Sequence, residues 1–99
     1  MNIKFRDQEL DKLDSDASFS CGWNDSIVST FRKRMQIIRS APDERVFYAM
    51  RSLHFEKLKG SRNHQFSMRL NDQWRLILEF EGKGESKVVE VIAIEDYHK

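Results

Sequence analysis

Apolar and polar residues alternate along the last third of the chain, which predicts β-strands there. In Trp74–Glu81 the apolar side chains occupy every second position, so they share one face of a strand. Arg75 falls on the opposite face, away from that apolar row. Further strands are predicted at His64–Leu70 and Lys87–Glu95, and the second of these is apolar on both faces, as an interior strand should be. Asn71-Asp72 is expected to form a tight turn, because Asx side chains bond the nearby backbone.

Apolar residues recur at helical spacing before the strands. The main stripe predicts a helix that begins after Asn24 or Asp25 as the cap and ends by Ala41, because Pro42 follows. A shorter helix is expected over Asp7–Asp14. The stripe consists of Val28, Phe31, Met35 and Ile38, with Ile27 and Ile37 beside it, and the opposite face carries Arg32, Lys33, Gln36 and Arg39. We interpret the stripe as core and the basic face as solvated surface, with contact to nucleic acid as the alternative.

The order of elements predicts an α+β domain. Ile3–Phe5 is a short strand candidate, Phe55–Leu58 reads as an edge strand, and Asp43–Leu53 is ambiguous between helix and loop. Helices therefore precede an antiparallel meander. We expect residues 1–99 to form a single domain in which N-terminal helices pack on one face of an antiparallel sheet of about four strands.

Composition is that of a globular chain in a reducing compartment. The 99 residues are 39% hydrophobic and 33% charged, and Cys21 is the one cysteine, so no internal disulfide can form. No apolar run of signal-peptide length opens the chain, and no window approaches a membrane span. A cytoplasmic protein without membrane association is expected.

Charge is unevenly distributed within a near-neutral chain of net charge +1. Residues 51–75 carry six basic and two acidic side chains, whereas residues 76–98 carry two basic and six acidic ones. A locally basic segment fits a bounded site for a polyanion. An ordinary solvated surface is the alternative, and charge alone favours it.

The strand pattern gathers basic and proton-transferring side chains at one end of the sheet. Arg69 and Arg75 alternate away from the core, and Glu56 lies near them on the preceding strand. The expected cluster consists of Lys59, Arg69, Arg75, Asp96, Tyr97 and His98, with Glu56 nearby. Taken singly, each has a structural explanation: Trp74 beside them belongs to the core, Arg75 can pair with Glu79 or another acid, and Asp96 can cap.

These side-chain types suit attack of an RNA 2′-hydroxyl on its own phosphate. That step needs a base, cations for the developing negative charge, and an acid for the leaving oxygen. Arginine clamps phosphate well, histidine exchanges protons near neutral pH, and the ring of Tyr97 offers a surface for a splayed base. No metal or cofactor is required, and the three histidines and Cys21 have no ligand spacing.

Together these motifs resemble the HigB branch of the RelE/ParE superfamily. The resemblance covers nearly the whole chain and rests on three stretches. They are Leu58-Lys59-Gly60 with Arg62, then Phe66-Ser67-Met68-Arg69-Leu70-Asn71-Asp72-Gln73-Trp74-Arg75-Leu76, and finally Glu95-Asp96-Tyr97-His98. These relatives are the toxins of type II toxin–antitoxin modules. The resemblance implies two N-terminal helices over an antiparallel sheet and a ribosome-dependent endoribonuclease (mRNA interferase) that cuts mRNA in the A site.

The resemblance also assigns roles to particular residues. Lys59 and Arg75 match positions that contact the scissile phosphate, and Asp96, Tyr97 and His98 match the terminal catalytic group. Lys57, Arg62 and Arg69 are expected to grip the RNA backbone. Glu56 departs from the members that carry histidine at its position. Our hypothesis is that His98 or Asp96 is the base and Tyr97 or His98 the acid, while Glu56 orients a cation.

Partners follow from the same resemblance. It implies a helix-turn-helix antitoxin of the HigA type, the 70S ribosome with its mRNA, and operator DNA bound only through the antitoxin complex. One alternative is a non-enzymatic toxin of the ParE kind that poisons DNA gyrase, and another is an RNA- or partner-binding domain without catalysis. The Lys/Arg and Asp-Tyr-His constellation favours the nuclease, because a gyrase binder has no need of it.

Overall fold

The longest helix begins where the sequence places its cap. The computed structural model describes residues 1–97. In it the side chain of Asn24 accepts a hydrogen bond from the Ile27 amide at 2.9 Å, so α2 (Asp25–Ser40) starts there. The helix ends at Ala41, ahead of Pro42. Its buried side chains are Ile27, Val28, Phe31, Met35 and Ile38, which confirms the predicted apolar stripe.

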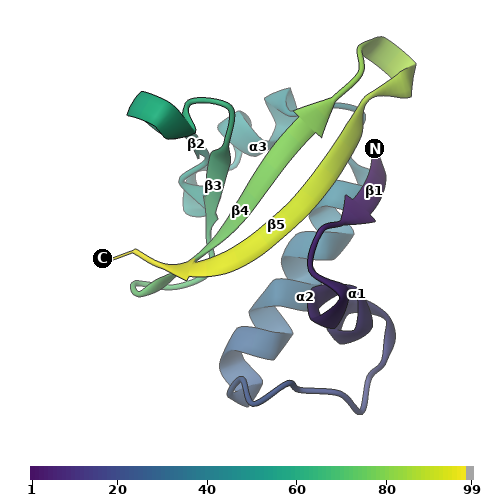
Figure 1. Ribbon diagram of the computed structural model, residues 1–99, viewed down its shortest axis with the longest axis vertical. Coiled ribbons are helices and arrows are strands. Elements are labelled where there is room, and N and C mark those ends of the chain that lie inside the picture. The colour runs from purple at the N-terminus through teal and green to yellow at the C-terminus, as the bar shows by residue number, and fades with distance from the viewer. Residues whose placement is uncertain (98–99) are drawn as a thin grey trace.

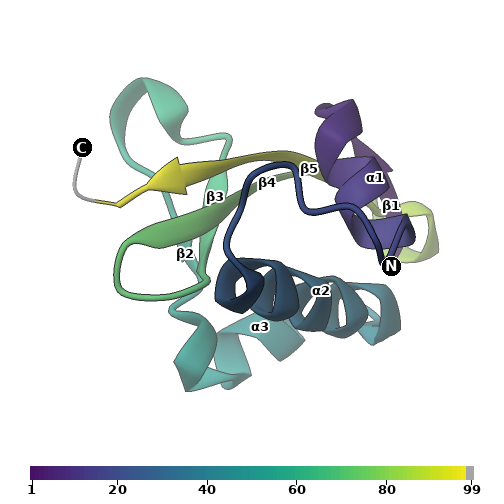
Figure 2. The same ribbon diagram turned by 90° about the horizontal axis from the view of Figure 1, so that it is seen from below.

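The remaining helices are short. Helix α1 (Gln8–Ser15) is capped by Asp7, whose carboxylate accepts from the Glu9 amide at 2.9 Å. The ambiguous segment contains α3 (Arg45–Ala49) and the 3-10 helix η1 (Arg51–Leu53). Figure 2 shows α2 and α3 on the same side of the sheet, with α1 beside the first strand. In residues 1–97 no helix is both long and apolar enough to cross a membrane.

The sheet has five strands, one more than the sequence predicted. They are β1 (Asn2–Phe5), β2 (Glu56–Lys57), β3 (Phe66–Arg69), β4 (Trp74–Glu81) and β5 (Val88–Asp96). Their order is β1-β5-β4-β3-β2 (Figure 1), so β5 is interior as predicted. The expectation of a purely antiparallel sheet was wrong, because β1 pairs with β5 in parallel. The two strands lie at opposite ends of the sequence, so no turn motif marks their pairing.

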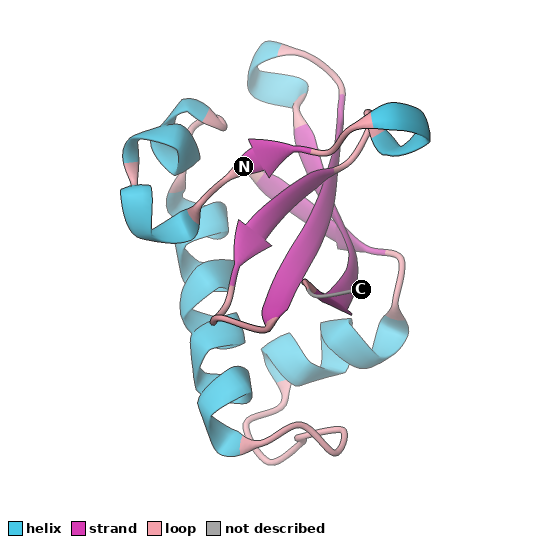
Figure 3. Ribbon diagram, turned by 90° about the vertical axis from the view of Figure 1, so that its left-hand side faces the viewer, coloured by secondary structure: helices cyan, strands magenta, loops and turns pink. Residues whose placement is uncertain are grey.

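The core lies between α2 and one face of this sheet. Leu76 and Leu78 of β4 are fully buried against the apolar stripe of the helix, together with Val89 and Val91 of β5. A register shift between Ile77 and Leu78 interrupts the pairing of β4 with β5. Figure 3 shows the twist of the sheet and the long helix running along one side of it. Arg75 and Glu95 lie on the opposite face of the sheet, near the C-terminal end of β5.

One basic residue of α2 has a structural role that the sequence did not indicate. The guanidinium of Arg32 donates to the backbone carbonyls of Leu13 at 3.0 Å, Asp16 at 2.9 Å and Phe19 at 3.1 Å. These carbonyls belong to the end of α1 and the loop that follows it, where no helical partner is available. Arg32 therefore fastens this loop to α2, and the interpretation of a wholly solvated basic face was wrong at this position.

We expect Arg32→Met to destabilise the protein by about 2 kcal/mol, because the methionine keeps the packing of the stem but removes the donor from the Leu13 and Phe19 carbonyls, while the Asp16 carbonyl keeps the Phe19 amide. Urea unfolding followed by circular dichroism measures this loss. Lys33→Met is the matched control, since Lys33 is exposed on the same helix. Equal stability of the two variants would show that the Arg32 hydrogen bonds contribute nothing.

Candidate functional site

Arg75 lies at the centre of a cluster of polar and aromatic side chains on the open face of the sheet. One guanidinium nitrogen, Nη1, donates to Glu56 Oε1 at 2.6 Å and to Ser67 Oγ at 2.9 Å. The ring of Tyr97 covers the guanidinium, with the ring centroid 3.7 Å from Cζ. Only 13% of the Arg75 side chain is exposed. The charge is therefore held in a fixed orientation by a carboxylate, a hydroxyl and an aromatic face.

The register of three strands brings these groups together. Glu56 of β2 is opposite Ser67 of β3, and Ser67 is opposite Ile77 of β4, so the three side chains share one face. Arg75 lies two positions before Ile77 and therefore on that same face. Its neighbour in β5 is Glu95. The predicted orientation of Arg75, away from the apolar row, is confirmed, but its partner is Glu56 rather than Glu79.

The turn between β3 and β4 anchors the end of β5. The Asn71 side chain accepts from the amides of Gln73 and Trp74, both at 2.8 Å, which confirms the predicted Asx turn. The Gln73 carbonyl accepts from the Tyr97 amide at 2.6 Å, and its side chain donates to Asp96 Oδ2 at 3.2 Å. Tyr97 follows Glu95 by two positions, so it shares the face of Arg75. The turn thus holds the tyrosine ring above the guanidinium.

A pocket of about 660 Å³ opens beside this cluster. Part of its lining is apolar, because Trp74, Ile77 and Ile94 contribute to it. Trp74 in turn packs edge-on against Trp23, with ring centroids 5.0 Å apart. The lining residues of the pocket are Glu56, Leu58, Arg62, Ser67, Trp74, Arg75, Ile77, Ile94, Glu95, Asp96 and Tyr97. Two arginines therefore face three carboxylates. In residues 1–97 no three His, Cys, Asp or Glu side chains are grouped so as to hold a metal ion.

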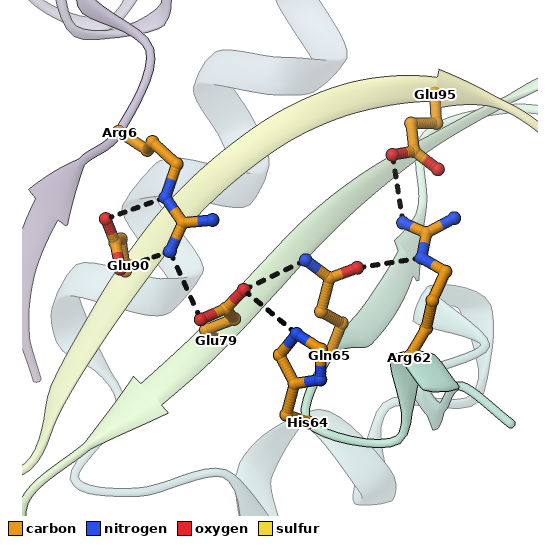
Figure 4. A network of polar contacts seen from close by, with 7 residues as sticks. All are labelled: Arg6, Arg62, His64, Gln65, Glu79, Glu90 and Glu95. Carbon is orange, nitrogen blue, oxygen red and sulfur yellow. Dashed lines mark hydrogen bonds and ion pairs between the residues drawn. The ribbon is translucent and has the colours of Figure 1, made fainter. Parts of the chain in front are cut away.

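Arg62 is held at the pocket by a chain of polar contacts that crosses the sheet (Figure 4). Its Nε donates to Gln65 Oε1 at 2.8 Å, and Nη2 donates to Glu95 Oε2 at 2.9 Å. The other end of the buried Gln65 amide donates to Glu79 Oε2 at 2.9 Å. Arg6 then joins Glu79 to Glu90 at 3.3 and 3.1 Å. A network that begins beside β1 thus fixes the side chain of Arg62.

Glu79 is the branching point of this network. The hydrogen bond from Gln65 lowers the pKa of the Glu79 carboxyl, burial opposes that shift, and the positive charge of Arg6 adds to it. His64 Nε2 lies 3.7 Å from Glu79 Oε2, a contact that is ionic only when the imidazole is protonated. Glu79 therefore serves the network rather than Arg75.

Five of the nine predicted site residues line one pocket, three do not, and one lies outside the described residues. The five are Glu56, Arg62, Arg75, Asp96 and Tyr97. Arg69 is opposite Arg75 in the ladder but pairs with Asp72 and lines an adjacent cavity. Lys57 is opposite Phe66 and shares its face, where Phe66 stacks on Phe55. Lys59 is exposed between Leu58 and Arg62, without lining the pocket, and His98 lies outside the described residues.

Two lining residues were missed by the sequence reasoning. Ser67 is fully buried and binds Arg75, and Glu95 binds Arg62. Alternation along the strands indicated the face of Ser67, since it lies two positions before Arg69. It did not indicate a partner, because the pairing of β2 with β3 was unspecified.

Comparison with known proteins places this fold among the RelE-like toxins. A solved structure of a YoeB/ParE toxin from Agrobacterium tumefaciens superposes with a TM-score of 0.69 at 18% sequence identity, over 98% of this chain and 99% of that one. At this identity the similarity shows the fold alone. No similar protein was found among curated sequences.

A family model supplies the assignment. Residues 3–98 match the model of the HigB-like toxins, described as the RelE-like toxin of the type II toxin–antitoxin system HigB. The chain therefore belongs to the HigB-like toxin family. It is a toxin of a type II toxin–antitoxin system, and an antitoxin is its partner. The predicted α+β architecture and the resemblance to the HigB branch are both confirmed.

We expect Glu79→Gln to remove part of the acid sensitivity of folding. A carboxyl whose pKa is lowered by folding stabilises the folded state above its unfolded pKa, about 4.3, and this contribution is lost as pH falls through the folded value. The difference in unfolding free energy between wild type and variant should therefore shrink as pH falls below about 5. Urea unfolding at several pH values measures it.

Glu81→Gln is the control, because the Glu81 carboxylate pairs with Lys4 at the surface. Its unfolding free energy should run closer to parallel with that of the wild type. The same parallel behaviour in Glu79→Gln would show that the network does not depend on the ionised carboxylate.

Proposed function

We propose that this toxin is a ribosome-dependent mRNA endoribonuclease, with Arg75 as the clamp for the scissile phosphate. The observation that carries the proposal is the environment of the Arg75 guanidinium. It points into an open pocket, a carboxylate lies 2.6 Å away, and an aromatic ring lies over it. A cation and a proton acceptor are two of the groups that cleavage by a 2′-hydroxyl requires, and the ring offers a surface on which a base can stack.

In the proposed reaction the 2′-oxygen attacks the adjacent phosphorus, and the bond from phosphorus to the 5′-oxygen breaks. A phosphate that binds Arg75 lies next to Glu56, so the geometry favours Glu56 as the base that takes the 2′-hydroxyl proton. The sequence favoured His98 or Asp96 for that role, with Glu56 orienting a cation. Tyr97 or His98 then protonates the leaving 5′-oxygen. The products are a 2′,3′-cyclic phosphate and a 5′-hydroxyl end.

Binding of the rest of the RNA is assigned to basic residues around the pocket. Arg62 is one of its lining residues, Lys59 is exposed beside Arg62, and Arg69 lines the adjacent cavity. Lys57 is exposed on the face that Phe66 shares, so it would reach RNA only around the edge strand β2. The pocket itself holds three carboxylates against two arginines, so its attraction for free RNA should be weak. This charge balance supports a reaction in which the ribosome presents the mRNA, and such a reaction would take place in the cytoplasm.

The antitoxin belongs to the same proposal. The family has an antitoxin partner, and we assign it to the HigA type, which has a helix-turn-helix domain. Operator DNA would then be bound by the complex through the antitoxin.

We expect Arg75→Ala to reduce cleavage of ribosome-bound mRNA by at least about 100-fold, because the variant loses the main group that stabilises the developing phosphorane charge. Primer extension on a reporter mRNA in a reconstituted translation system measures the cuts. Arg45→Ala is the matched control, since Arg45 is an exposed arginine paired with Asp43 away from the pocket. Unchanged cutting in Arg75→Ala would contradict its role. Absence of cutting by the wild type, with growth arrest and damaged DNA, would favour a gyrase poison.

We expect Glu56→Gln to lower the rate of the chemical step by about 100-fold or more, because the amide still accepts a hydrogen bond from Arg75 but cannot take up the proton. Single-turnover cleavage on programmed ribosomes across a pH series measures this rate. The variant should also lose the part of the pH profile that reports the base. If Glu56→Gln cleaves at the wild-type rate, Glu56 only orients Arg75, and the base is another group.

A further inference from the structure

A second cavity lies on the other side of the Arg75–Tyr97 pair. It measures about 350 Å³ and is lined by His54, Arg69, Asn71, Asp72, Arg75 and Tyr97. Its volume is at the lower end of the range of ligand sites in proteins. Arg75 and Tyr97 line the first pocket as well, so the two cavities share one wall. A strand of RNA whose phosphate binds Arg75 would therefore pass from one cavity into the other.

The second cavity is rich in cationic groups. Arg69 is directly opposite Arg75 across the ladder, an arrangement that is unfavourable for like charges. Arg34 of α2 does not line the cavity, but it is a third cation nearby, because its Nε donates to the Arg69 carbonyl at 3.0 Å. Burial lowers the pKa of the Arg34 guanidinium, and the charge of Arg69 lowers it further. The structure thus concentrates positive charge here against electrostatic repulsion.

Each of the two facing arginines has its own carboxylate. Arg75 binds Glu56, and Arg69 binds Asp72 three residues along the turn. The Asp72 side chain is 94% exposed, so little is lost when it turns into solvent. An incoming phosphate oxygen can take its place on the guanidinium, since a guanidinium can bind two oxygens of either a carboxylate or a phosphate through parallel N–H···O bonds.

His54 contributes the third polar side chain of this cavity. Its backbone is left-handed, with φ 44° and ψ 47°, between the buried residues Leu53 and Phe55. Glycine adopts this conformation without strain, whereas histidine adopts it at a cost. The turn itself therefore does not account for a histidine, whose exposed side chain lines the cavity.

We propose that this second cavity is a phosphate subsite for the mRNA phosphodiester next to the scissile one. Arg69 and His54 bind that phosphate, and Asp72 occupies Arg69 until the RNA arrives. The proposal rests on the proposed nuclease function and adds a second point of contact to it. Two phosphate contacts on one strand would hold the mRNA more tightly than the Arg75 contact alone.

The proposal predicts opposite effects on KM for substitutions of Arg69 and Asp72, the two members of one ion pair. We expect Arg69→Gln to raise the KM for mRNA-programmed ribosomes about tenfold with little change in kcat, and Asp72→Asn to lower it. Arg45→Gln and Asp43→Asn are the matched controls, because they remove the same charges from an Arg–Asp pair elsewhere. Neither control should move KM. A purely structural role of the Arg69–Asp72 pair would shift both variants in the same direction.

The source of the phosphate is tested with a modified substrate. An mRNA carries a neutral methylphosphonate at the linkage before or after the cut. We expect one of these substrates to raise the KM of the wild type. On that substrate Arg69→Gln should raise KM no further, because the methylphosphonate and the substitution remove the same interaction. A full effect of Arg69→Gln on both modified substrates would overturn the proposal and point to ribosomal RNA instead.

His54→Gly provides an independent check, since glycine keeps the left-handed turn. Thermal unfolding should show a Tm no lower than that of the wild type, while KM rises on the unmodified substrate and not on the affected methylphosphonate. An unchanged KM would remove His54 from the subsite. If the wild type cuts no mRNA at all, the proposed function fails. If it cuts normally while Arg69→Gln and Asp72→Asn behave like their controls, only the second subsite fails.

Discussion

The register of β4 between β3 and β5 determines where the charged groups of the pocket lie. It places Arg75 between Arg69 and Glu95 in one row, and Ile77 next to Ser67 in the following row. Glu56 reaches Arg75 only because β2 continues the second row. A shift of one residue would turn Arg75 toward the core and Leu76 into the pocket. Burial of the apolar side chains of β4 in the core therefore fixes the register, and the register in turn fixes the positions of the polar side chains on the opposite face.

The second consequence of this register is that the arginines are satisfied in the absence of RNA. Arg75 binds Glu56, Arg69 binds Asp72, and Arg62 binds Glu95. Three guanidinium groups brought together without carboxylates would repel one another and weaken the sheet edge. The same ion pairs compete with phosphate, so affinity for RNA is reduced. A reaction that depends on the ribosome tolerates this competition, because the ribosome presents the mRNA at high local concentration.

Local patterns explain how much of this could be predicted from sequence. Alternation in β4 gave the face of Arg75, Asn71 gave the turn, and the apolar β5 gave its interior place in the sheet, since each of these depends on neighbouring residues. The ion pair between Arg75 and Glu56 could not be predicted, because it depends on the pairing of a two-residue strand with β3. The parallel pairing of β1 with β5 and the contacts of Arg32 with the loop after α1 were missed because they too join residues that are not close neighbours in the sequence. The grouping of Glu56, Arg75, Asp96 and Tyr97 was predicted from the alternation and order of the strands, and the family motifs then supported it.

The basic segment, residues 51–75, and the acidic segment, residues 76–98, place their charges in different parts of the sheet. Glu79, Glu81 and Glu90 lie along β4 and β5, away from the pocket end, and they bind Arg6 and Lys4 from the N-terminal region. That part of the open face is thus occupied by carboxylates that repel an RNA backbone. The cations available to RNA lie at the other end, around the turn at Asn71 and the ring of Tyr97. Under the proposed function, attraction and repulsion on one sheet face would act together and direct the RNA strand toward the two cavities that share Arg75.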